Sequence, residues 1–404
     1  MDKVRIGVLG LGRGTFAMNY CEKASNAVVT AICDFNVHKL DAKKREGIAC
    51  FTDFDEFIKY ENMDAVVLAN YGTEHAPFAV KALKNGKHVL SEVLPFQNLK
   101  EGVELVEAVE ESGLVYGFAE NYAYMPCNRE MRKMVKDGRI GKFEYGEGEY
   151  LHNCEDGWRA RTGYNPDNWR NHMPSTFYCT HSIGPMIHIA GERPVKVTGF
   201  ELPYNERMRR MGAKAAPVAI EMITLESGAI IKSIHGVGVS KNSYWFNMYG
   251  SKGRAECARE ATGEHVNYKK LLVNIDEYEG QNILDAEMRY YPHDEFTNVS
   301  RDFGHGGGDY LTMYHFCEAV LGRENDMIDI YEACDMFLPG LFAYRSILAG
   351  GMPMEIPNFR NKADRDKYRF DTACTDKNVA GDMLQPSYHE GNPDIPNEVY
   401  KRPE

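Results

Sequence analysis

The chain has 404 residues, of which 43% are hydrophobic and 26% charged, a composition that excludes a disordered chain. Its 47 basic and 59 acidic residues give a net charge of −12, so we expect no nucleic-acid partner. No apolar run approaches the roughly 20 residues that span a bilayer, so we expect no membrane partner. The ten cysteines form no close pairs, and no metal site is expected. The first residues enter a strand pattern without a signal-peptide pattern, which predicts a cytoplasmic protein.

The first 125 residues alternate between short apolar runs and helical patterns. The apolar runs lie at 4–11, 27–34, 64–70, 87–93 and 114–121. Continuous apolar runs separated by helices are typical of a parallel sheet that is covered on both faces. We therefore predict a doubly wound α/β domain of the Rossmann type over residues 1–125.

The pattern changes after residue 125. A predicted helix over 128–138 is followed by stretches in which apolar and polar residues alternate, as in an antiparallel sheet with one wet face. Late helices are predicted over 309–322 and 330–348. We predict a second α/β domain with a large, mostly antiparallel sheet over 126–355, and an extended arm over 356–404.

A glycine-rich turn ends the first predicted strand. Gly10 would allow the tight turn, and Gly12 would let the backbone approach a pyrophosphate at the start of the next helix. The usual third glycine would fall on Thr15, whereas this chain has Gly14 one residue earlier. The motif follows a strand and precedes a helix, and this context favours a dinucleotide site.

Asp34 ends the second predicted strand, 22 residues after Gly12. This is close to the spacing of roughly 20 residues expected for the acid that binds the adenosine ribose. Phe35 and Asn36 follow, and no adjacent Arg could hold a 2′-phosphate, so NAD is favoured over NADP. The alternative is that Asp34 only caps a turn.

Several segments resemble the Gfo/Idh/MocA oxidoreductases over roughly residues 3–350. They are Gly7 to Gly14, the stretch from 64 to His75, the segment 82–89, Ser91-Glu92 and the element 138–141. The resemblance implies an NAD-binding Rossmann domain, a substrate domain whose sheet often forms an interface, and a homo-oligomer, dimer or tetramer. Val93 stands where the family commonly has the lysine that assists proton removal.

A narrower set of motifs resembles the NAD-dependent glycosidases of glycoside hydrolase family 109 and related glycoside oxidoreductases. These motifs are Glu92-Val93, Glu120 to Tyr124, 146–150, 178–185 and 304–309. The resemblance implies catalytic roles for Tyr124, Tyr178 and His181. It implies substrate contacts for Tyr150, Tyr178, His181 and, more loosely, Tyr244. We expect the cofactor to be held by Gly10, Gly12, Arg13, Gly14, Asp34, Asn70, His75, Glu92, Val93 and Asn121.

Each candidate also has a purely structural explanation. His181 could be a hydrogen-bonded core histidine, Tyr124 an aromatic packed at a domain junction, and Tyr150 part of a sheet surface. Asp309, in a glycine-rich loop, could simply cap the following helix.

Three functions are compatible with these residues. The first is an NAD-dependent oxidoreductase that removes hydride from C3 of a sugar or glycoside. The second is an NAD-dependent glycosidase that adds elimination, hydration and reduction, and the third is a non-catalytic NAD sensor.

Overall fold

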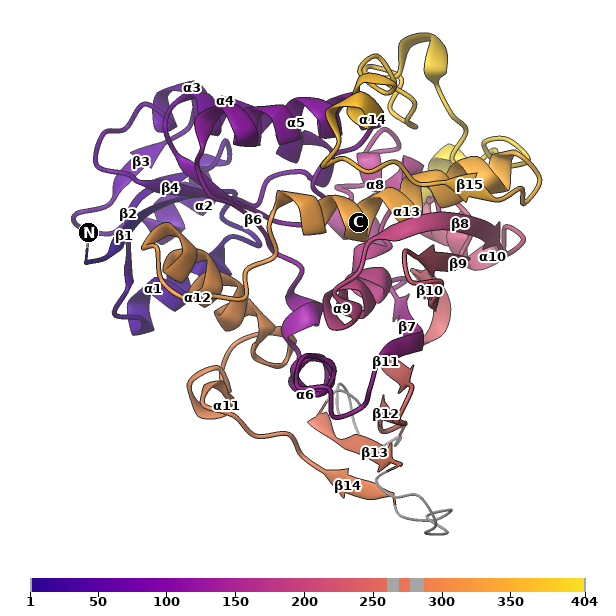
Figure 1. Ribbon diagram of the computed structural model, residues 1–404. Helices are drawn as coiled ribbons and strands as arrows, with labels where there is room; N and C mark the ends of the chain where they lie inside the picture. The colour runs from indigo at the N-terminus through magenta and orange to yellow at the C-terminus, as the bar shows by residue number, and fades with distance from the viewer. Residues whose placement is uncertain (1, 260–268, 277–286, 403–404) are drawn as a thin grey trace. The chain divides into compact units, whose positions relative to one another are not determined.

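A computed structural model describes residues 2–259, 269–276 and 287–402 (Figure 1). By its contacts the chain divides into two compact units, and neither is continuous in sequence. Unit 1 comprises Met1–Tyr124, Glu295–Cys334 and Phe359–Asp371, and unit 2 comprises Met125–Asp294, Asp335–Asn358 and Thr372–Glu404. This division differs from the continuous ranges 1–125, 126–355 and 356–404 expected from the sequence, because the chain returns to unit 1 twice.

Unit 1 contains a six-stranded parallel sheet in the order β3-β2-β1-β4-β5-β6. Its strands are β1 (Val4–Leu9), β2 (Ala27–Cys33), β3 (Ala49–Phe51), β4 (Ala65–Leu68), β5 (His88–Ser91) and β6 (Tyr116–Phe118). Residues 65–68 are buried throughout, as expected for a strand covered on both faces. The strand order reverses beside β1, which is where such sheets bind ligands at their carboxyl edge.

Helices cover this sheet, with α4 and α5 on one face and α1 and α12 on the other (Figure 1). The helices and turns of unit 1 are α1 (Thr15–Lys23), α2 (Val37–Lys43), α3 (Phe54–Phe57), η1 (Gly72–Glu74), α4 (His75–Lys84), α5 (Leu99–Ser112), η2 (Asn121–Tyr124), α11 (Phe296–Val299), η4 (His305–Gly307), α12 (Gly308–Val320) and α14 (Lys362–Asp366). Helix α5 begins at the side-chain cap Asn98, which accepts a hydrogen bond from the Glu101 N–H. It ends before Gly113, whose φ of +63° suits a glycine.

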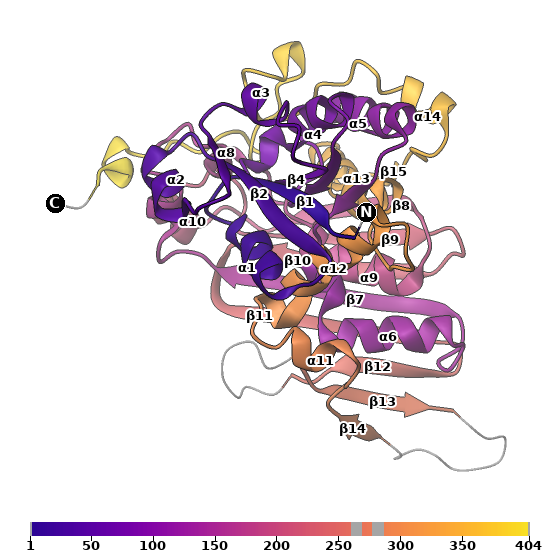
Figure 2. The same cartoon turned by 90° about the vertical axis from the view of Figure 1, so that its left-hand side faces the viewer.

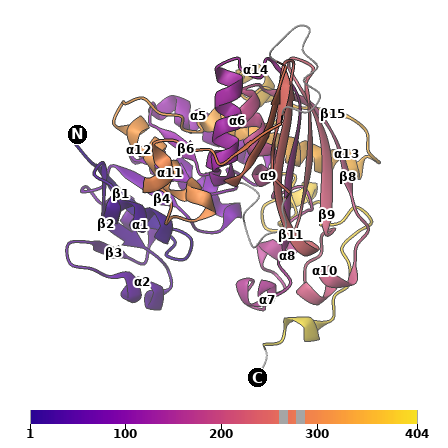
Figure 3. The same cartoon turned by 90° about the horizontal axis from the view of Figure 1, so that it is seen from below.

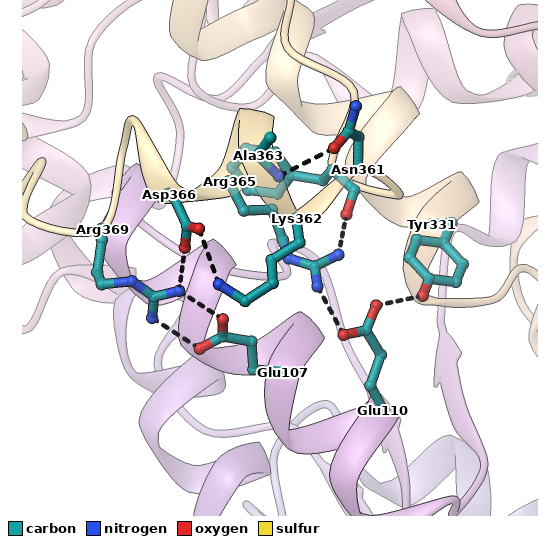
Figure 4. A network of polar contacts seen from close by, with 10 residues as sticks. Glu107, Glu110, Tyr331, Asn361, Lys362, Ala363, Arg365, Asp366 and Arg369 are labelled. Carbon is teal, nitrogen blue, oxygen red and sulfur yellow. Dashed lines mark hydrogen bonds and ion pairs between the residues drawn. The ribbon is translucent and has the colours of Figure 1, made fainter.

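The late segment Phe359–Asp371 packs on α5 through charged side chains (Figure 4). Arg365 is 3% exposed and donates to Glu110 at 2.6 Å. Arg369 makes a two-pronged contact with Glu107, at 2.6 and 2.8 Å. This part of the expected extended arm is therefore a structural component of unit 1.

Unit 2 is built on a nine-stranded sheet in the order β14-β13-β12-β11-β7-β10-β9-β8-β15 (Figure 2). Its strands are β7 (Phe143–Asn153), β8 (Pro194–Glu201), β9 (Val218–Leu225), β10 (Ile230–Gly236), β11 (Gly238–Gly250), β12 (Gly253–Cys257), β13 (Leu271–Ile275), β14 (Met288–Tyr290) and β15 (Met354–Glu355). Neighbouring strands are antiparallel except for β7 and β10. The predicted fold class, a parallel sheet plus a mostly antiparallel one, is confirmed.

The helices and turns of unit 2 are α6 (Pro126–Lys136), α7 (Trp158–Arg161), α8 (Trp169–His172), α9 (Thr180–Ala190), α10 (Glu206–Met211), η5 (Gly381–Met383) and η6 (Asn397–Tyr400). Helix α13 (Ile330–Leu348) starts in unit 1 and continues into unit 2. Among the described residues, no helix combines the length and apolar character that a membrane crossing requires.

Glycines let helices approach one face of the unit 2 sheet closely. A Cβ on Gly148 would lie 1.9 Å from the Ser182 carbonyl oxygen of α9, and one on Gly199 would lie 2.4 Å from the Ala343 carbonyl oxygen of α13. Gly148 and Gly199 share a cross-strand row with Ser233 and Glu221. Both helices therefore cover the same face, which we call the helix-covered face; Figure 3 shows α9 beside the sheet.

Candidate functional site

The glycine turn after β1 has the geometry of a nucleotide-binding loop. Gly10 has a φ of +86°, and a Cβ there would lie 2.4 Å from the Ala69 carbonyl oxygen. A Cβ on Gly14 would lie 2.5 Å from the Gly10 carbonyl oxygen and 2.7 Å from a Val8 methyl group. Gly14 therefore allows the close packing of helix on strand that the third glycine of the motif usually provides, although it comes one residue early.

The loop leaves room for a ligand at Gly12. A Cβ there would find only the Lys39 Nζ within 4 Å, at 3.7 Å, so the backbone is open to an approaching group. Helix α1 follows and has no acidic side chain in its first turn, so its positive end is not neutralised. Both features fit the pyrophosphate of a dinucleotide.

Asp34 lies directly after β2 and is 4% exposed. One carboxylate oxygen accepts the Leu11 N–H at 2.8 Å, and the other accepts the Asn36 N–H at 2.8 Å. These bonds fix the carboxylate beside the glycine turn, as binding to ribose hydroxyls requires. The Asp34 carboxylate, the glycine turn and the start of α1 together fit a bound NAD.

Arg13, predicted to bind the cofactor, contacts two carboxylates. Its Nε lies 2.8 Å from Glu92, and its two Nη atoms lie 2.9 and 2.6 Å from Asp309. Burial lowers the pKa of Arg13, but Glu92 and Asp309 outweigh it and hold that pKa above its ordinary value. Asn121 and His305 also reach Asp309, each at 3.0 Å. We call this group the Arg13 cluster.

The Arg13 cluster joins three of the predicted cofactor residues, Arg13, Glu92 and Asn121. Asp309, which links them, was noted in the sequence as the end of the 304–309 motif and as a helix cap, without a role at the cofactor site. Burial raises its pKa, but the bonds from Arg13 and His305 prevail, and the pKa lies well below its ordinary value. Gly12, Arg13 and Asp309 also line a groove of about 560 Å³. Asp309 therefore stays ionised and connects the glycine-rich segment 304–308 to the nucleotide-binding loop that follows β1.

The other predicted cofactor residues follow β4 and β5. Asn70 donates to Glu74 at 3.2 Å, and the buried His75 contacts the Leu94 carbonyl oxygen at 2.8 Å. Val93 is buried after β5. These positions lie past the carboxyl ends of parallel strands, the edge that also carries Gly10 and Asp34.

Four predicted substrate residues meet in unit 2, where they form what we call the aromatic cluster. Tyr150 and Tyr244 face each other across β7 and β11, with ring centroids 5.6 Å apart. His181, in the first turn of α9, lies 4.8 Å from Tyr150 and 5.3 Å from Tyr178 between ring centroids. Burial, followed by Tyr178 and Tyr244, raises the pKa of Tyr150. The contact of α9 with Gly148 brings the helix start to the strand that carries Tyr150.

Tyr124 does not belong to the aromatic cluster of unit 2. It lies in unit 1, is 2% exposed, and its hydroxyl donates to the Asp326 carbonyl oxygen at 2.8 Å. For Tyr124 to remove a substrate proton, its hydroxyl would have to give up this hydrogen bond to Asp326.

Sequence reasoning missed one polar group beside the aromatic cluster. His235 on β10 lines a small cavity together with Tyr150, Tyr178 and Arg170. The only signal was its alternation with Ile231 and Ser233, which placed it on the helix-covered face without indicating a role.

Two family models match the chain, and they match different parts of it. The model of the Gfo/Idh/MocA oxidoreductase family, with an NAD-binding Rossmann fold, matches residues 4–120. The model of the glycosyl hydrolase 109 C-terminal domain matches residues 226–365. Residues 4–120 therefore match an NAD-binding oxidoreductase domain, and residues 226–365 match a glycosyl hydrolase 109 C-terminal domain. The resemblance seen in the sequence and the predicted NAD-binding domain are confirmed.

Two curated proteins are similar to most of the chain. A glycosyl hydrolase family 109 protein of Saccharopolyspora erythraea is 24% identical, over 89% of this chain and 83% of the relative. An alpha-N-acetylgalactosaminidase of Tannerella forsythia is 24% identical, over 88% of this chain and 86% of the relative.

Solved structures share the fold. Levoglucosan dehydrogenase in complex with NADH and L-sorbose superposes with a TM-score of 0.72 at 17% identity, over 89% of this chain and all of the other. An NAD-binding oxidoreductase from Klebsiella pneumoniae also gives a TM-score of 0.72, at 14% identity, over 88% of this chain and 99% of the other. At these identities the likeness describes the fold alone.

Proposed function

We propose that this protein, an NAD-dependent enzyme that acts on carbohydrate, oxidises a secondary hydroxyl of a sugar or glycoside, at C3, and releases the 3-keto product. The observation that carries the proposal is the aromatic cluster, in which His181 lies among Tyr150, Tyr178 and Tyr244. Aromatic rings can pack on the apolar face of a sugar. An imidazole among them can take the hydroxyl proton near neutral pH.

Oxidation removes a proton from the hydroxyl oxygen and a hydride from the carbon. NAD, held by the nucleotide loop, would supply the acceptor for the hydride. The proposal assigns the proton to His181 and the orientation of the reacting hydroxyl to Tyr178. Tyr150 and Tyr244 hold the ring, and their burial keeps water away from the reacting carbon. Asp34 and the glycine turn bind the dinucleotide.

A glycosidase cycle is the second candidate, and the glycosyl hydrolase 109 C-terminal match over 226–365 favours it. Once C3 is a ketone, the C2 proton becomes acidic, and a base could remove it as the C1 group leaves. Water addition and return of the hydride to C3 would complete the cycle. It requires a base for C2 and an acid for the leaving group in addition to His181.

One incubation separates these candidates: p-nitrophenyl glycosides with catalytic NAD. Stoichiometric NADH with an intact keto-glycoside supports the oxidoreductase. Continuous release of nitrophenol, with solvent deuterium incorporated at C2, supports the glycosidase and refutes the simple oxidation. If neither occurs with any glycoside although NAD binds, both proposals are refuted.

We also propose a cytoplasmic homo-oligomer, dimer or tetramer. All ten cysteines are free, which supports a reducing compartment. The sheet face opposite the helix-covered face carries Phe200, Met222 and Ile230, which are 52%, 37% and 39% exposed and could be buried against a second copy. Light scattering of the purified protein and fractionation of the cells test the two statements.

A further inference from the structure

A histidine stands in the same row of the unit 2 sheet as the two sheet tyrosines of the aromatic cluster. Tyr244 lies opposite Tyr150, Tyr150 is paired with His235, and His235 is paired with Ala219. Residues paired in this way point to the same face of a sheet. His235 therefore lies on the helix-covered face, next to Tyr150.

A buried carboxylate lies beside this histidine. The Nδ1 atom of His235 lies 3.4 Å from Oε2 of Glu221 and 3.5 Å from the hydroxyl of Ser182. Ser182 is also 2.9 Å from Ser233 between hydroxyl oxygens. Glu221 is fully buried and His235 is 1% exposed.

Burying a carboxylate is expensive unless a partner offsets the loss of water. Among the described residues, His235 is the one basic side chain within 4.0 Å of the Glu221 carboxylate. The contact with Glu221 is not a hydrogen bond by its geometry. Because Nδ1 faces Glu221 and Ser182, we assign the ring proton to Nδ1, which leaves Nε2 with a lone pair. Within the described part of the chain, that buried Nε2 has no hydrogen-bond partner.

His235 is one of the residues that line a small cavity. It has a volume of about 20 Å³, enough for one water-sized group, for which roughly 10–15 Å³ suffices. Its other polar lining includes Tyr150, Tyr178 and Arg170, while Met173 and Met208 belong to its apolar lining. Arg170 lies over the Tyr178 ring, 5.8 Å from its centroid. The cavity thus adjoins the aromatic cluster.

We infer that His235 is a substrate-binding residue whose Nε2 accepts a hydrogen bond from one sugar hydroxyl seated in this cavity, and that Glu221 is its positioning residue. The inference rests on the proposed action on sugars. It adds a specificity element: a hydroxyl that can donate is required at one position of the ring. A sugar that lacks this hydroxyl, or carries it as a methyl ether, leaves Nε2 unpaired and is rejected.

The experiment compares variants on a series of substrates. His235→Asn keeps an N–H group that can donate toward Glu221 but removes the Nε2 acceptor. Glu221→Gln replaces the carboxylate beside Nδ1 by an amide. Ser233→Ala is the matched control, because it alters the same buried network without lining the cavity. Each protein is tested for melting temperature, NAD affinity, sugar binding by calorimetry and kcat/KM on the parent glycoside and its monodeoxy analogues.

We expect His235→Asn to lower kcat/KM on the parent glycoside roughly 10- to 100-fold, as the loss of one buried hydrogen bond predicts. We expect no further loss on one monodeoxy analogue, the one that lacks the bound hydroxyl. Glu221→Gln should show a weaker effect with the same dependence on the analogue, and Ser233→Ala should match the wild type. NAD affinity should be unchanged in all three, because the nucleotide loop is in unit 1.

Two results would overturn the inference alone. One is an active wild-type protein together with a His235→Asn variant whose kcat/KM on the parent glycoside is within about twofold of the wild-type value. The other is an equal loss on every analogue, which would indicate a buried pair that only supports the fold. If His235→Asn does not fold, the analogue dependence of Glu221→Gln decides the question. A wild type that holds NAD but neither binds nor turns over any sugar refutes the proposed function, and the inference with it.

Discussion

Replacing Gly148 by Ala tests whether the start of α9 is fixed by close contact with the sheet. The new Cβ would lie 1.9 Å from the Ser182 carbonyl oxygen, whereas ordinary contacts begin near 3.4 Å. The obstructing atom belongs to the backbone and cannot rotate away. The first turn of α9, which carries His181, therefore has to move by about 1.5 Å, if ordinary contact distances are to be restored.

We expect the substitution to destabilise unit 2 by about 1–3 kcal/mol, the usual range for an overpacked core. We expect a larger effect on turnover, because a displacement of about 1 Å in an active site can lower the rate roughly 100-fold. The assay is the melting temperature together with kcat/KM on the best glycoside. NAD affinity should not change, since the glycine turn belongs to the other unit.

Gly146→Ala is the matched control on the same strand and the same face. Its Cβ would lie 2.7 Å from the end of the Phe143 ring and 2.8 Å from the Met186 sulfur, which are side-chain atoms that can shift. We expect a smaller loss of stability and near-normal turnover. Wild-type melting and turnover in Gly148→Ala would refute the reasoning, and so would equal damage from both substitutions.

Three further predictions concern unit 1. Asp34→Ala should weaken NAD binding much more than NADP binding in a fluorescence titration; an equal loss would contradict the ribose role. The pKa of Glu101 is raised from 4.5 to about 7, first by burial, so its stabilising contribution is present below pH 4.5 and lost as the pH rises through 7. Glu101→Gln should remove up to about 3 kcal/mol of this pH dependence in unfolding curves, and unaltered curves would reject the raised pKa. Arg365→Met should destabilise unit 1 by about 1–3 kcal/mol in denaturant, because the Phe359 carbonyl oxygen and Glu110 lose the hydrogen bonds of a buried guanidinium; a change within error would show that the late segment is dispensable.

The parallel sheet could be predicted from the sequence because each of its central strands is a continuous apolar run between helices. The nucleotide-binding turn could also be predicted, because Gly10, Gly12 and Asp34 have nearly the order and spacing of the dinucleotide-binding motif. The sequence did not predict which segments of the chain make up unit 1. Arg365 and Glu110 are 255 residues apart, and no periodicity connects a charged side chain to a partner so distant in sequence.

The aromatic cluster could be expected only through family resemblance. Tyr150, Tyr178 and Tyr244 come from separate elements, and one needs the strand register and the course of α9 to bring them together. His235 was not predicted, because a single histidine in an alternating strand has the same pattern as any buried residue of the sheet. The role of Asp309 was missed for a related reason: a local role as a helix cap was sufficient to explain it.

The interleaving of the two units along the chain bears on how the protein is made. A ribosome delivers the six strands of the nucleotide sheet early, but α12 and the segment that packs on α5 only after most of unit 2 has emerged. Domains usually fold in the order of their synthesis. Here the nascent first sheet lacks α12 and the late segment that completes unit 1 until residue 371 leaves the exit tunnel.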